Sequence, residues 1–130
     1  MRRLLEVEAT RRAAARMDRH VLHKLLRETR RFFESGADDQ EWELDQRIHA
    51  AIAQSCGNQL LGHEIERFST LVQAIRVTVG ARVPVQYETT EQHLKLLNAI
   101  TTGDSEAAAD SMQRHLEAAK QAAVTAIAVW

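Results

Sequence analysis

The sequence has very little cysteine, proline, glycine or aromatic character: one Cys, one Pro, five Gly and 5% aromatic residues among 130. The lone Cys56 excludes a disulfide framework and a cysteine-rich zinc site, and it fits a reducing compartment. An all-β chain needs a turn roughly every 8–12 residues, which so few prolines and glycines do not supply. No apolar run approaches the roughly 18 residues of a membrane span, and no signal peptide opens the chain. These absences predict a soluble, cytoplasmic, all-α protein with no membrane partner.

The residues that are present fit one globular domain. Hydrophobic residues make up 45% and charged residues 27%, and helix formers such as alanine, leucine and glutamate are abundant. A length of 130 residues predicts a single domain over 1–130. The net charge of −1 excludes a domain that binds polyanions with its whole surface.

The charge is nevertheless uneven along the chain. Residues 1–31 carry ten basic and four acidic side chains, and residues 32–130 carry seven and fourteen, which gives +6 followed by −7. Either the first helices have solvated basic faces, or this end lies near an anionic neighbour. The chain also starts inside a helical pattern, at Met1-Arg2-Arg3-Leu4-Leu5-Glu6, as a fragment of a longer protein would.

Capping residues and apolar spacing divide the sequence into six helices. In the first, Leu4, Leu5, Ala9, Ala13 and Met17 recur at helical spacing. Short connections between consecutive helices predict an antiparallel bundle. The first three predicted helices run over about 2–16, from a cap at Asp18 to Ser35, and over 40–55 after a cap at Asp38 or Asp39. The last three run from a cap at Asn58 to about residue 79, over 84–100, and from a cap at Asp104 or Ser105 to near the C-terminus. Gly103 is predicted to adopt a left-handed conformation in the turn before the last helix.

The most informative polar residues occupy apolar helix faces. Asp45 and His49 are four residues apart, so they lie on one face, which Ile48 and Ile52 share. His93 shares a face with Leu96, Leu97 and Ile100, and His115 continues the stripe of Ala108, Met112 and Ala119. Three helices therefore direct imidazole or carboxylate groups towards the interior.

The heights of the two last histidines match. His93 precedes the turn at Gly103-Asp104 by ten or eleven residues, and His115 follows it by eleven or twelve. At about 1.5 Å per residue, both lie roughly 15–18 Å from that turn. The two imidazoles are therefore expected to face each other across an antiparallel helix pair.

Buried imidazoles without partners are costly, and a divalent metal would satisfy them. Asp45, His49, His93 and His115 are the candidate ligands. Their nitrogen and oxygen atoms are suitable ligands for Zn²⁺, Ni²⁺, Mn²⁺ or Fe²⁺ and do not discriminate among these ions. Zn²⁺ is our first candidate. His20, His23 and His63 are expected at the surface, although His63 is left open as a fifth ligand. The pattern has no separate general base or nucleophile motif.

Several segments resemble the FCD domain, the C-terminal ligand-sensing domain of FadR-subfamily regulators in the GntR family of bacterial transcription factors. The start at Met1–Glu6 is similar, Leu44–His49 resembles the family's D-x-x-x-H segment, and Ser55–Leu61 resembles the turn that follows it. Glu91–Ile100, Gly103-Asp104 and Met112–Leu116 match the last two helices, including the interval of 22 residues between the histidines. Ile48 stands where the family more often has an aromatic residue. The resemblance covers essentially all 130 residues.

The resemblance implies six or seven helices around a central cavity, where a metal on Asp45, His49, His93 and His115 binds a small organic acid. It implies a homodimer that contacts DNA only through an N-terminal winged-helix domain, which this chain lacks. Arg2 matches the family's first-helix arginine and is the leading candidate for an anionic effector group. Thr89 lies one turn before His93, and Asn58 and Arg76 are further candidates, although a helix cap and a surface ion pair would equally explain those two.

Two other functions remain open from the sequence. Three histidines and an aspartate around a metal could activate water in a hydrolase-type enzyme. The metal could also be purely structural. We expect a regulatory domain that is not an enzyme, because no independent general base accompanies the proposed ligands.

Overall fold

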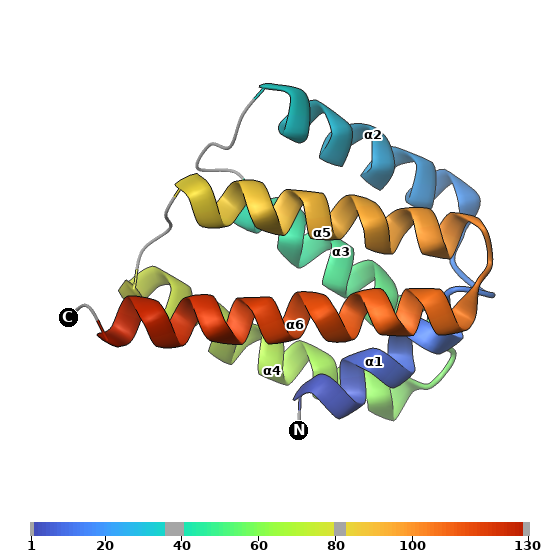
Figure 1. The fold of residues 1–130 in the computed structure, drawn as a ribbon. Coiled ribbons are helices and arrows are strands. Elements are labelled where there is room, and N and C mark those ends of the chain that lie inside the picture. The colour runs from blue at the N-terminus through green and yellow to red at the C-terminus, as the bar shows by residue number, and fades with distance from the viewer. Residues whose placement is uncertain (1, 36–40, 80–82, 129–130) are drawn as a thin grey trace.

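The computed structural model describes residues 2–35, 41–79 and 83–128, and within these ranges the secondary structure consists of helices joined by turns, with no strand. The predicted all-α fold is confirmed. Figure 1 shows α5 and α6 side by side, with α2 packed against α5 and α1 against α6. The six helices of the described residues are α1 (Arg2–Ala13), α2 (Arg19–Ser35), α3 (Glu41–Ser55), α4 (Gln59–Val79), α5 (Val83–Thr101) and α6 (Ser105–Ala128).

Side-chain caps begin three of these helices as the sequence predicts. The Asp18 carboxylate accepts hydrogen bonds from the backbone N–H groups of His20 and Val21 at the start of α2. Asn58 Oδ1 accepts from the N–H of Leu61, and Asp104 Oδ1 from the N–H of Ala107. The predicted openings at Asp38 or Asp39 lie outside the described residues.

Two glycines with positive φ close helices. Gly57 has φ 77° between α3 and α4, and Gly103 has φ 72° between α5 and α6. Glycine adopts this left-handed conformation without the steric penalty that a Cβ brings. The tight turn at Gly103 makes α5 and α6 an antiparallel pair, which places His93 and His115 opposite each other.

The first helix differs from its prediction in two respects. It ends at Ala13 rather than near Arg16, because residues 14–16 form a turn in which the N–H of Arg16 bonds to the carbonyl of Ala13. Leu4, one of the apolar residues whose spacing predicts this helix, is 70% exposed. The buried face of α1 is instead formed by Glu6, Ala9, Thr10 and Ala13, and Leu4 lies well away from it around the helix.

The core lies between α3, α5 and α6 and extends to α2. Its fully buried side chains include Ile48 and Ile52 of α3, Leu96 and Leu97 of α5, and Met112 of α6. The second helix buries Leu22, Leu25, Leu26 and Thr29 and exposes its basic side chains, which accounts for much of the positive charge near the N-terminus. None of the helices in the described residues is both long enough and apolar enough to span a membrane.

Candidate metal centre

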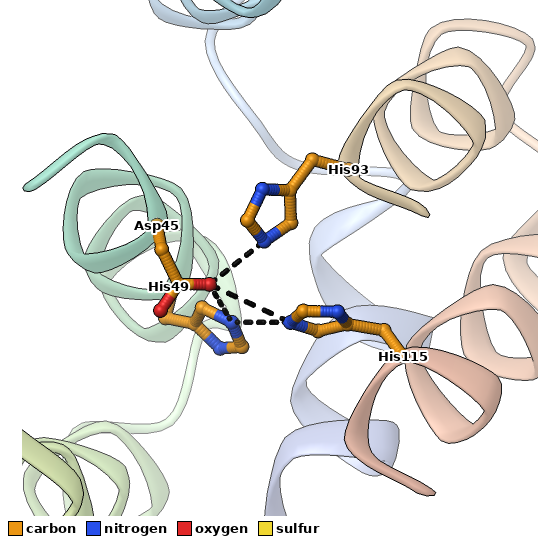
Figure 2. A group of neighbouring side chains, drawn as sticks. All are labelled: Asp45, His49, His93 and His115. Carbon is orange, nitrogen blue, oxygen red and sulfur yellow. Dashed lines mark hydrogen bonds and ion pairs between the residues drawn. The ribbon is translucent and has the colours of Figure 1, made fainter. Parts of the chain in front are cut away.

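Four buried side chains from three helices meet in the core. Asp45 and His49 come from successive turns of α3, His93 from α5 and His115 from α6, and none is more than 4% exposed. Each offers one ligand atom, and these four atoms all lie within 4.8 Å of one another. Figure 2 shows the three imidazole rings directed at the Asp45 carboxylate. The structure thus brings together all four residues that the sequence selected as metal ligands.

The four atoms that converge are one carboxylate oxygen and three imidazole Nε2 atoms. Asp45 Oδ1 lies 2.7 Å from Nε2 of His93, 3.2 Å from Nε2 of His49 and 3.5 Å from Nε2 of His115. The Nε2 atoms of His49 and His115 are 3.2 Å apart. The ring centroids of His93 and His115 are 4.6 Å apart, so the two histidines face each other at one level, as the turn at Gly103 predicts.

This donor set fits a divalent transition metal. Ligands that bind an ion at about 2.0–2.1 Å are separated from one another by roughly 2.9–3.4 Å at octahedral or tetrahedral angles. The separations of 2.7–3.5 Å around Asp45 Oδ1 bracket that range. Nitrogen donors with one carboxylate oxygen are also the ligands that such ions prefer. The group could therefore hold a metal ion, although its chemistry does not decide which one.

The carboxylate at the centre carries its charge under ordinary conditions. Burial by itself would raise the pKa of Asp45. The positive charge of His49 and hydrogen bonds from the three histidines outweigh burial and hold this pKa well below 3.8. An ionised carboxylate in the core is a strong ligand for a cation.

Two of the histidines have opposite tendencies to protonate. Burial would lower the pKa of His49, but the carboxylates of Glu6 and Asp45 overcome it and raise that pKa to about 9. Burial and the positive charge of His93 lower the pKa of His115 to about 3, and the hydrogen bond that His115 donates to Asp45 does not offset them. Because metal ligation requires neutral imidazole, His49 must release a proton when a metal binds.

Two residues that the sequence analysis missed support the rings from behind. Oε1 of Glu6, on α1, contacts Nδ1 of His49. Oε1 of Gln92, on α5, lies 2.8 Å from Nδ1 of His115. An acceptor at Nδ1 fixes the tautomer in which Nε2 is free to bind a metal. The sequence feature that could have identified Glu6 is its helical spacing. It precedes Ala9, Thr10 and Ala13 by three, four and seven residues and so shares a face of small residues with them.

The predicted effector residues are more scattered. Thr89 is half-buried on α5, one turn before His93. Asn58 is exposed, and its side chain caps α4. The side chains of Arg2 and Arg76 lie outside the part of the structure that is described, although both residues belong to helices, α1 and α4. Their roles towards an effector stay predictions.

The remaining histidines with described side chains are at the surface. His20 and His23 are exposed on α2, as expected. His63 is also exposed and lines a surface hollow with Asn58, Gly57 and Glu66. None of the four cluster residues lines this hollow, so it is separate from the candidate metal centre.

The described helices and the buried aspartate and three histidines place this chain among small all-helical domains built around a candidate metal centre. The family model of the FCD domain matches residues 1–118, and the chain belongs to this family. A comparison with curated proteins found no match. FCD domains are regulatory, ligand-sensing domains of GntR-family regulators, so the family resemblance in the sequence is confirmed.

Proposed function

We propose that this domain senses a small carboxylate effector through a divalent metal ion held by Asp45, His49, His93 and His115. The observation that carries the proposal is the convergence of four buried ligand atoms, from three helices, within 4.8 Å. Family membership supports the regulatory role, because FCD domains bind effectors on behalf of a DNA-binding domain. Zn²⁺ is the first candidate, with Ni²⁺, Mn²⁺ and Fe²⁺ as alternatives.

The protein residues determine how such an ion is held. Asp45 supplies negative charge, and the three imidazoles supply neutral nitrogen donors, two of which are oriented through Nδ1 by Glu6 and Gln92. When bound, the ion supplies a Lewis-acidic site for effector oxygens. Thr89 is a candidate for a further hydrogen bond to the effector, because it precedes His93 by one helical turn. Arg2 remains our leading candidate for pairing with the anionic group, and Asn58 and Arg76 are weaker candidates.

The metal assignment is tested by removing two ligands from different helices. We expect the wild-type protein, after loading with Zn²⁺ and desalting, to retain about one ion per chain by elemental analysis. The variant carrying His93→Ala and His115→Ala should retain almost none, whereas His20→Ala with His23→Ala, which alters two exposed histidines of α2, should behave as wild type. Equal metal content in the first variant and the wild type would overturn the assignment.

A structural metal is a second candidate, which the burial of the site favours. All four ligands are at most 4% exposed, and an ion there would join α3, α5 and α6. Calorimetric titration of the Zn²⁺-loaded protein with a panel of mono-, di- and hydroxycarboxylates separates the functions. Saturable binding that is lost with the metal supports sensing, and no binding by any acid supports the structural role. Turnover of an ester or amide substrate would instead support the hydrolase alternative.

The partners of the domain follow from the same proposal. We propose a homodimer whose contact with DNA is made by a separate winged-helix domain, and a cytoplasmic location. Sedimentation of the 130-residue chain, with and without Zn²⁺ and a binding carboxylate, tests the dimer. A chain that remains monomeric in all four conditions at micromolar concentration would contradict it.

A further inference from the structure

The docking of α1 on the bundle depends unusually little on large apolar side chains. Among the described residues of α1, Leu4 is 70% exposed, Leu5 and Val7 are half-buried, and the fully buried positions are Glu6, Ala9, Thr10 and Ala13. By contrast, α2 buries three leucines. Less apolar burial means less hydrophobic stabilisation of the helix against the bundle.

The ion pairs at the edges of α1 do not compensate. Arg3 pairs with Glu117 at 3.4 Å and Arg11 with Glu106 at 2.9 Å, and these side chains are between 38% and 78% exposed. Pairs at such exposure contribute little, because water and salt screen them. Among the described side chains, the contact of Glu6 with His49 is a buried polar link between α1 and the rest of the core.

That contact ends on a residue of the metal centre. Glu6 is 2% exposed, and its Oε1 meets Nδ1 of His49, whose Nε2 points to Asp45 and His115 on the other side of the ring. One imidazole thus separates α1 from the four converging ligand atoms. A carboxylate behind a ligating histidine holds the ring in orientation, and a metal at Nε2 makes the Nδ1–H a stronger donor to that carboxylate.

We propose that Glu6 is a positioning residue that couples metal binding by the His49 imidazole to the docking of α1. The coupling is reciprocal, because a contact that favours the metal-bound state is favoured by the metal to the same extent. The inference rests on the proposed function, since it requires a metal at His49. It adds that α1, which carries none of the four candidate ligands, also gains stability when the centre is occupied.

Gln92 provides the matched comparison. It meets Nδ1 of His115 as Glu6 meets Nδ1 of His49, but it belongs to α5, which carries His93 itself. Loss of either acceptor should weaken metal binding. Only loss of the Glu6 carboxylate should also abolish the effect of the metal on the docking of α1.

The experiment measures Zn²⁺ affinity and hydrogen exchange in the same set of proteins. Competition with a chromophoric chelator should show that Glu6→Ala and Gln92→Ala each bind Zn²⁺ about 10–100-fold more weakly than wild type. At saturating Zn²⁺, the amides of α1 should become more protected in wild type and in Gln92→Ala but not in Glu6→Ala. Glu6→Gln retains an acceptor oxygen and should recover part of both effects.

Thr29→Val controls for a general loss of stability. Thr29 is fully buried on α2, and its hydroxyl bonds the carbonyl of Leu25 rather than a histidine. This variant should bind Zn²⁺ as wild type does and keep the Zn²⁺-dependent protection of α1. If Glu6→Ala does not fold by circular dichroism, Glu6→Gln and Gln92→Ala still decide the matter, because only the former should reduce the protection of α1.

The outcomes separate this inference from the function on which it rests. If wild type binds no Zn²⁺ and none of the other candidate ions, the proposed function fails and the inference fails with it. If wild type binds Zn²⁺ but Glu6→Ala shows wild-type affinity and wild-type protection of α1, only the inference is overturned. If Gln92→Ala lost as much protection of the α1 amides as Glu6→Ala, the inference would also be overturned. The protection would then depend on Zn²⁺ affinity in general and not on the contact of Glu6 with His49.

Discussion

His49 and His115 lie side by side, with ring centroids 5.2 Å apart, yet their surroundings shift their pKa values in opposite directions. Burial acts on both. His49 is also flanked by the carboxylates of Glu6 and Asp45, whereas His115 faces the positive charges of His93 and His49. Of these two histidines, His49 is therefore the one that carries a proton near neutral pH, and it would have to lose that proton to a metal.

This contrast predicts a stability profile for the metal-free protein with a maximum near pH 6.5. An unfolded histidine titrates at about 6.5. Because the pKa of His49 is raised to about 9, its contribution is complete below about 6.5 and is lost as the pH rises towards 9. Because the pKa of His115 is lowered to about 3, its contribution is lost as the pH falls from about 6.5 towards 3, and that of Asp45 is lost below about 4.

Bound metal should remove the alkaline decline of this profile. With Zn²⁺, the imidazole of His49 is already neutral, so the affinity for Zn²⁺ should rise between about pH 6.5 and 8.5 while the stability of the metal-bound protein stays level. Urea unfolding across this range, with Zn²⁺ or with a chelator, measures both slopes. The metal-free His49→Gln variant serves as the control and should lack the alkaline decline. A metal-free wild type whose stability keeps rising to pH 8.5 would contradict the assignment of the proton to His49.

At the scale of the elements, the junction between α3 and α4 combines a backbone requirement with a side-chain contact. Gly57 has φ 77°, and a Cβ built on it would clash with Nη1 of Arg16. That guanidinium donates a hydrogen bond to the carbonyl of Cys56 at 2.8 Å. The turn after α1 is therefore joined to the end of α3, which is the helix that carries Asp45 and His49.

We expect Gly57→Ala to destabilise the protein more than Gly103→Ala does. Both positions require a left-handed backbone, which costs a residue with a Cβ about 1–2 kcal/mol. At Gly103 a Cβ would have no neighbour within 4 Å, whereas at Gly57 it would displace Arg16 from Cys56 and forfeit a further ~1 kcal/mol. Urea unfolding of both variants measures the difference. In an Arg16→Ala background the two substitutions should cost the same, and a difference that persists there would rule out this explanation.

At the scale of the whole molecule, an ion at the centre would join α3, α5 and α6, and through Glu6 also α1. Metal should therefore stabilise the entire fold and not only the site. At a free Zn²⁺ concentration of 100 times its Kd, the gain is about 2.7 kcal/mol. For a domain of this size that corresponds to a rise in Tm of roughly 10 °C.

Thermal unfolding with Zn²⁺ and after chelation tests this expectation. The wild-type Tm should fall on chelation and return when Zn²⁺ is added back. His93→Ala should show a much smaller response, and the exposed His23→Ala should respond as wild type. A Tm that does not change on chelation, in protein shown to contain metal, would mean that the ion is held without contributing to the fold.

The sequence by itself determined the helices and the four candidate ligands. Caps such as Asp18 and Asn58, the glycine at 103 and the apolar spacing act within one or two turns of chain, so they can be recognised without the fold. The pairing of His93 with His115 could also be derived, because a tight turn fixes the level of residues counted from it. The first helix was less well determined, because its few large apolar side chains do not define a core face, and Leu4, which shares their spacing, is exposed.

Only the tertiary structure decided which groups stand behind the ligands. Glu6 and His49 are 43 residues apart, and their contact exists because α1 packs against α3, which no local signal encodes. The same packing buries the carboxylate and so sets the opposite pKa shifts of His49 and His115. Short-range hydrogen bonding and periodicity are properties of a segment, whereas burial and charge proximity arise only when separate segments pack together.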